Sequence, residues 1–171
     1  NYEPVSVSGQ VFYKLGRQED GPEGNVFGPW DPETFEVEDS AFGLIKMKNG
    51  ATIYLESSWA LNVLKSMEAS TTLCGTKAGA EIHHGGSYPN DELIYNFAEH
   101  NQLMEKTISP AGVVDFFEGG AAAEAVKEQH QWMDAIINDG EPLVKPEQAF
   151  VVTQILDAIY KSAETGKEIY L

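Results

Sequence analysis

The chain has 171 residues, of which 42% are hydrophobic, and its 27 acidic and 11 basic side chains give a net charge of −16. A domain commonly takes about 100–200 residues, so this composition predicts one packed core. The charge would repel phosphate backbones and anionic lipids, and no apolar run reaches the roughly 20 residues that span a bilayer. We therefore expect no nucleic acid or membrane partner, and a cytoplasmic protein.

The first part of the chain predicts strands around one long loop. Residues 5–15 alternate between apolar and polar types, as a half-buried strand does. Residues 16–34 are rich in Gly, Pro and acids and predict the loop. Residues 35–47 and 51–59 flank Asn49-Gly50, a pair that tolerates positive φ and so predicts a hairpin.

The rest of the chain predicts more strands and then helices. Strands are expected at 68–75 and 80–83, followed by a hairpin of 93–98 and 103–108. Apolar stripes of helical period predict helices at 121–139, closed by Gly140, and from Pro146 to Gly166, with a last short strand at 167–171. The order predicts an α+β fold: an open-faced, mainly antiparallel sheet with two C-terminal helices packed on one face.

The hairpin at 35–59 carries apolar residues in both registers of its strands. One sheet face would then pack on the helices, and the other would need a second domain or a second subunit to cover it. The chain does not start with Met, and we expect it to be part of a longer protein.

Three residues are candidates for holding a ligand. Trp30, Asp39 and Trp59 combine aromatic surface with a carboxylate, an arrangement that binds polyols and sugars. The structural alternative makes Trp59 a core residue and Trp30 a loop anchor. Glu36, Glu38 and Asp39 form a possible acid/base cluster, but in so acidic a chain we expect a solvated strand end.

The other reactive side chains predict no chemistry. Cys74, the single cysteine, should be a small buried thiol in a strand. His83 and His84 are adjacent on a strand and point to opposite faces, so no metal site is expected. His130, four residues before Asp134 on a predicted helix, should be a partly buried structural histidine. Residues 105–107 should be a solvated strand edge.

Three segments together resemble a known family. They are Ile-Tyr-Leu-Glu-Ser-Ser-Trp-Ala at 53–60, Leu-Cys-Gly-Thr-Lys-Ala-Gly-Ala at 73–80, and the tail from Lys-Pro-Glu-Gln-Ala at 145–149 through Ile-Leu-Asp-Ala-Ile-Tyr at 155–160. In this order they resemble the C-terminal domain of the Gfo/Idh/MocA oxidoreductases, the family of glucose-fructose oxidoreductase and inositol dehydrogenase. The likeness covers nearly all of the chain and implies a dihydrodipicolinate reductase-like sheet domain over residues 1–171.

The resemblance also implies that two domains of a longer protein have different roles. An N-terminal Rossmann domain would bind NAD or NADP, while this domain would line a sugar or polyol pocket and form a homo-oligomer through its sheet face. The family's Glu-Lys-Pro and Asp-x-x-x-His motifs and the G-x-G-x-x-G fingerprint do not occur in this sequence. We therefore expect no catalytic residue, cofactor site or metal in this chain, and no activity from it alone.

Two alternatives use the same fold differently. A non-catalytic ligand-binding or dimerisation module would need no Rossmann domain. A free-standing acid/base enzyme would use Glu38 or Asp39.

Overall fold

A computed structural model describes residues 2–19, 28–64, 69–84, 92–108 and 123–171. Their contacts form two compact units, one of residues 1–62 with 134–171 and the other of residues 63–133. The architecture is α+β, as predicted, and every strand pair in the described residues is antiparallel. The strands divide into two four-stranded sheets, one in each unit.

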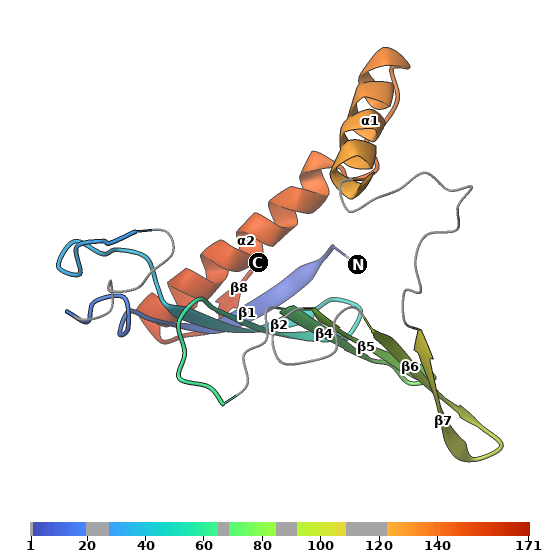
Figure 1. The fold of residues 1–171 in the computed structure, drawn as a ribbon, viewed down its shortest axis with the longest axis horizontal. Coiled ribbons are helices and arrows are strands. Elements are labelled where there is room, and N and C mark those ends of the chain that lie inside the picture. Colours follow the sequence, from blue (N-terminus) through green and yellow to red (C-terminus); the bar gives the residue numbers. More distant parts are fainter. Residues whose placement is uncertain (1, 20–27, 65–68, 85–91, 109–122) are drawn as a thin grey trace. The chain divides into compact units, whose positions relative to one another are not determined.

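The first sheet has the strand order β3-β2-β1-β8, and its strands β1, β2 and β8 are labelled in Figure 1. Its strands are β1 (Pro4–Phe12), β2 (Ser40–Met47), β3 (Thr52–Ser58) and β8 (Ile169–Tyr170). The hairpin predicted at Asn49-Gly50 is confirmed, because Gly50 has a φ of 88° and its N–H donates to the Met47 carbonyl at 2.9 Å. The short strand β8 pairs with β1 only at Ser6 and Val7.

Helix α2 (Pro146–Thr165) covers one face of this sheet. Proline fits its first turn, and Gly166 ends it in the left-handed conformation, with a φ of 67°. The sheet and the helix share one core, made of Val7, Ile45, Met47, Ala158 and Ile159. Gly9 and Gly43, neighbours on β1 and β2, allow close approach, because a Cβ on either would lie 2.7 Å from the Ile159 side chain.

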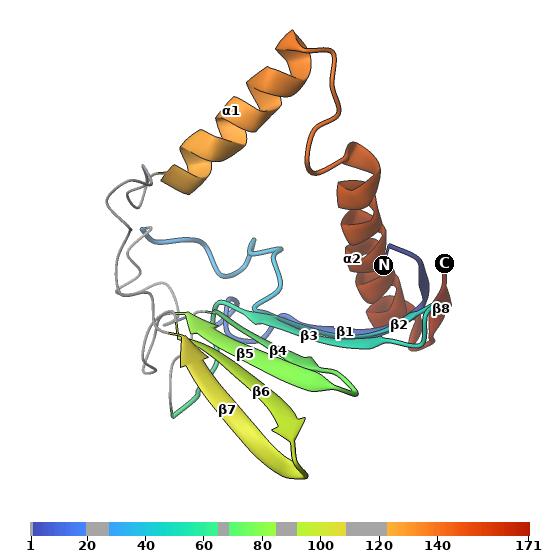
Figure 2. The same ribbon diagram turned by 90° about the vertical axis from the view of Figure 1, so that its right-hand side faces the viewer.

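The second sheet has the order β4-β5-β6-β7 (Figure 2). Its strands are β4 (Ala69–Cys74), β5 (Ala78–His84), β6 (Leu93–Glu99) and β7 (Gln102–Ile108). The predicted hairpin between the last two is confirmed, and its turn places His100 and Asn101 at φ values of 50° and 60°. Residues 105–107 lie on the exposed edge strand β7, as expected.

The first of the two predicted helices is α1 (Ala123–Ile137). Packing of a helix on a sheet is seen for α2, whereas α1 contacts no other helix or strand among the described residues. Consistent with this, His130 is exposed, so the prediction of a partly buried histidine is wrong. Neither of these helices is long and apolar enough to cross a membrane.

Two further sequence predictions are corrected. The strand predicted from residue 35 begins at Ser40, because residues 35–39 instead turn back to hold the preceding loop. Cys74 is exposed rather than buried, since it lies on β4, an edge strand of a sheet that carries no packed helix among the described residues.

Candidate functional site

Asp39 is a buried carboxylate that holds a turn of the chain. It is 2% exposed, and its Oδ2 accepts hydrogen bonds from the backbone N–H groups of Lys14, of Leu15 at 2.6 Å and of Gly16 at 3.5 Å. Its Oδ1 accepts from the Ser40 hydroxyl at 3.2 Å. The expectation of a solvated strand end is therefore wrong for Asp39, whose carboxylate replaces water as the partner of a turn.

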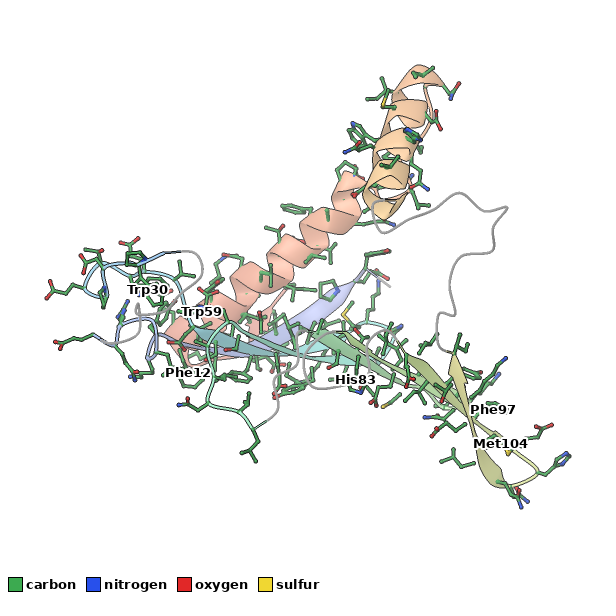
Figure 3. The ribbon with its side chains drawn as sticks, viewed as in Figure 1. Phe12, Trp30, Trp59, His83, Phe97 and Met104 are labelled. Carbon is green, nitrogen blue, oxygen red and sulfur yellow. The ribbon has the colours of Figure 1, made fainter. Side chains whose placement is uncertain are left out.

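Three aromatic rings, Trp30, Phe35 and Trp59, form a cluster that we call the aromatic wall. Their centroids lie 5.4 to 5.6 Å apart, and the two indoles meet edge to face (Figure 3). Trp30 donates from Nε1 to the Gly16 carbonyl at 2.8 Å, which is the predicted loop anchor. Trp59 is 50% exposed and so is not the core residue that the structural alternative required.

Glu38 connects this wall to helix α2. Its backbone carbonyl accepts a hydrogen bond from Trp59 Nε1 at 2.7 Å. Its carboxylate accepts one from the Tyr160 hydroxyl at 2.6 Å. This hydrogen bond raises the pKa of Tyr160 to about 12, with burial and the charge of Glu38 acting in the same direction.

An open cleft of about 400 Å³ lies between β1 and α2, beside the Glu38–Tyr160 hydrogen bond. Its lining residues are Gln10, Val11, Tyr13, Tyr160, Ala163 and Glu164. The Arg17 guanidinium lies 5.2 Å from the centre of the Tyr13 ring and donates from Nε to the Phe35 carbonyl at 3.1 Å. Arg17 thus contacts both Tyr13, which lines the cleft, and Phe35 of the aromatic wall.

The described residues that line the cleft offer hydroxyl, amide and carboxylate groups, and the Arg17 guanidinium lies over the ring of one of them, Tyr13. Such groups can hydrogen-bond to the hydroxyl groups of a ligand. The Trp59 indole is linked to this cleft through Glu38, which binds both Trp59 and Tyr160.

The other candidate residues do not join this site. Glu36 is exposed, and the carboxylate of Glu38 is engaged by Tyr160. His83 is half-buried and its Nε2 contacts Glu81 Oε1, whereas the side chain of His84 lies outside the described residues. Within the described parts of the chain, no three His, Cys, Asp or Glu side chains come together as metal ligands.

Sequence reasoning missed Tyr160 and the rest of the cleft. One signal for it was present: Tyr160 follows Val152 and Leu156 at four-residue spacing, a second apolar stripe on α2 beside the buried one. The cleft brings Tyr160 beside Gln10 and Val11 of β1, which are remote in the sequence, so the sequence did not indicate the contact.

A family model for the Gfo/Idh/MocA oxidoreductases, described as the C-terminal alpha/beta domain, matches residues 4–171. The chain belongs to this family. Among curated proteins, the D-glucoside 3-dehydrogenase of Escherichia coli K12 is 34% identical to it, over 97% of this chain and 42% of the relative's length. The chain thus spans less than half of this relative.

Solved structures show the same fold. An aldose-aldose oxidoreductase from Caulobacter crescentus, complexed with glycerol, matches with a TM-score of 0.65 and 20% identity, over 99% of this chain and 42% of its own. A levoglucosan dehydrogenase in complex with NADH and L-sorbose matches with a TM-score of 0.66 and 20% identity, over 98% and 44%.

This chain's own residues do not fit a nicotinamide dinucleotide. Such cofactors are held by a parallel β-α-β unit with a glycine-rich turn at a helix N-terminus. The described strands are all antiparallel, and the sequence lacks the G-x-G-x-x-G fingerprint.

Proposed function

We propose that this chain is the substrate-pocket and oligomerisation domain of an NAD- or NADP-dependent oxidoreductase that acts on a sugar or polyol hydroxyl. The observation that carries the proposal is the match of residues 4–171 to the C-terminal domain of the family, in a chain without dinucleotide-binding features. A Rossmann domain in the same protein would bind the cofactor and supply the catalytic groups, leaving the isolated chain inactive.

Within this domain, Trp59 is the proposed sugar contact, because half of its surface is exposed and its indole binds Glu38, whose carboxylate binds Tyr160 of the cleft. Trp30 packs behind it and Asp39 holds the turn beneath, so both would shape the pocket without being the main contact. The dehydrogenase relative acts on D-glucosides by name, which makes a D-glucoside the first substrate to try.

The test uses the complete protein encoded by the reading frame, assayed for reduction of NAD or NADP by a D-glucoside. Trp59→Ala should raise KM by roughly threefold to tenfold with little change in kcat, which corresponds to one aromatic contact. Trp132→Ala is the matched control, because Trp132 is 54% exposed on α1, outside the wall. Equal KM values for the two variants would reject the role of Trp59.

The assay also separates the dehydrogenase from the binding-module alternative. A complete protein that binds D-glucosides but reduces neither nicotinamide with any sugar or polyol would be a non-catalytic module. The reading frame upstream of Asn1 offers a second check, since the dehydrogenase needs a glycine-rich turn, Glu-Lys-Pro and Asp-x-x-x-His there.

The proposed homo-oligomer would use the second sheet, one face of which is mostly apolar and also carries Lys106 and, at one end, Glu99 and Gln102. Alternating positions place the following residues on that face: Leu73, Ile82, Leu93, Tyr95, Phe97, Met104 and Ile108. Phe97 and Met104 are direct partners across β6 and β7 (Figure 3). Most of these side chains are more than a third exposed, and a second copy of the sheet is the proposed cover.

The oligomer is tested with two neighbouring residues on opposite faces of β7. Met104→Glu places a charge on the apolar face and should dissociate the assembly, as measured by light scattering after gel filtration. Leu103→Glu, on the other face and 79% exposed, should leave the assembly intact. An unchanged mass for Met104→Glu would refute this interface.

A further inference from the structure

Glu38 bonds to two different parts of the fold, one through its backbone and one through its side chain. Its backbone carbonyl binds the indole of Trp59 at 2.7 Å, and its carboxylate binds the phenol of Tyr160 at 2.6 Å. One residue therefore bonds to both the aromatic wall and helix α2, two elements that are about 100 positions apart in the sequence.

The helix end of this connection is fixed. Tyr160 directly follows Ala158 and Ile159, which are 1% and 3% exposed and belong to the core against β1 and β2. Ser162, two residues further on, is also buried and accepts the Gly9 N–H at 2.9 Å. The Tyr160 hydroxyl is thus presented from a rigid backbone, because both sides of it are packed on the sheet.

The wall end is held by hydrogen bonds of loop residues and not by a packed helix or strand. Residues 28–39 contain no helix or strand, and Trp59 lies just beyond the end of β3. Asp39 ties this segment to β1, since its N–H donates to the Phe12 carbonyl at 2.9 Å. The Glu38 carboxylate adds an attachment to helix α2, whereas the bonds from Trp30 to Gly16 and from Arg17 to Phe35 hold the wall to the loop after β1. The bond to Tyr160 therefore helps to set the angle at which Trp59 faces solvent.

We infer that Glu38 and Tyr160 are positioning residues, which fix the aromatic wall to helix α2 and so set the affinity for the sugar. The inference rests on the proposed sugar contact of Trp59. Neither side chain takes part in the chemistry. Loss of their hydrogen bond lets the wall move away from helix α2 and weakens substrate binding in the ground state and the transition state alike.

The experiment is a double-mutant cycle in the complete protein, with kcat and KM measured on the D-glucoside that serves best. Tyr160→Phe and Glu38→Ala should each raise KM about threefold to tenfold at unchanged kcat, the effect of one hydrogen bond. The double variant should be no worse than either single one, because both remove the same bond. Glu38→Gln keeps a carbonyl acceptor and should restore most of the affinity.

The matched control is Tyr54→Phe. Tyr54 donates to Glu56 at 2.7 Å, a pair of the same kind on the exposed strand β3, and its loss should leave KM unchanged. Near-ultraviolet circular dichroism of the coupled Trp30 and Trp59 indoles should change in Tyr160→Phe and stay constant in Tyr54→Phe.

The results distinguish failure of the positioning role from failure of the proposed sugar contact. If Trp59→Ala raises KM but Tyr160→Phe does not, the positioning role is refuted while the proposed sugar contact stands. If Tyr160→Phe raises KM and Glu38→Ala does not, Tyr160 acts by direct contact and the inference is again overturned. If Trp59→Ala has no effect on KM, the proposed contact itself fails.

Discussion

A methyl group added at Gly9 tests how α2 is seated on its sheet. The new Cβ would lie 2.7 Å from Ile159 Cγ2, but also 2.9 Å from the Ile159 Cα and 3.0 Å from its carbonyl oxygen. Backbone atoms cannot rotate away, so the helix must shift. At Gly43 the nearest atoms are Cδ1 and Cγ1 of the same side chain, at 2.7 and 3.1 Å, and a rotamer change can relieve the clash.

These contacts give different free energies of unfolding. Overpacking costs about 1–3 kcal/mol, and a helix shift at Gly9 would also loosen the bond from its N–H to Ser162, worth about 1 kcal/mol. Replacing Gly by Ala returns about 0.4–1 kcal/mol by restricting the unfolded chain. We expect a loss of about 2–3 kcal/mol for Gly9→Ala and about 1 kcal/mol for Gly43→Ala.

The assay is urea denaturation followed by tryptophan fluorescence, with Ile159→Val as the diagnostic second change. Valine lacks Cδ1, the atom nearest to a Cβ at Gly43, but keeps Cγ2 and the backbone that a Cβ at Gly9 would meet. The double variant with Gly43→Ala should therefore show rescue, and that with Gly9→Ala should not. Equal costs for the two glycines, or rescue of both, would refute this packing argument.

Three more predictions concern polar contacts. Asp39→Ala leaves buried backbone N–H groups without an acceptor and should cost about 3 kcal/mol in thermal or urea unfolding, whereas Asp39→Asn should cost less. Because its bond to Glu38 raises the pKa of Tyr160 to about 12, the stability from this neutral phenol is complete below about pH 10 and is lost as the pH rises through 12. Tyr160 is 42% exposed, so the difference from Tyr160→Phe in alkaline titrations should be only about 1 kcal/mol. Hydrogen bonding to Lys46 lowers the pKa of Glu168. The stability that this carboxylate contributes is therefore present at neutral pH and is lost on acidification below the ordinary pKa of 4.5. The Glu168→Gln variant should lack this pH-dependent loss of stability in acid unfolding.

Local chemistry determined most of the elements. Asn49-Gly50 specified a hairpin because both residues tolerate positive φ, and Pro146 and Gly166 marked the ends of α2 because one suits a first helical turn and the other a left-handed cap. Alternation and helical period placed the strands and helices within a few residues. The resemblance carried by three segments led to the family, which the family model then matched over residues 4–171.

The site depended on contacts that no local pattern encodes. In a chain of net charge −16, Asp39 was predicted to be solvated at a strand end, yet the fold buries it against the turn at Lys14 to Gly16. The sequence left open whether Trp59 is a core residue or a ligand contact. Its exposure depends on how its ring packs against Trp30 and Phe35. The proposed role of these residues in sugar binding stays a prediction.

The amino-acid sequence by itself determined the α+β class, the hairpins, the helix ends and the family, because each depends on backbone preference or on short ordered motifs. Only the tertiary structure decided that Glu38 meets Tyr160 and that Gly9 lies against Ile159. These pairs are separated by more than 100 positions, and their contact depends on how α2 packs across β1 and β2, which no short window of sequence contains.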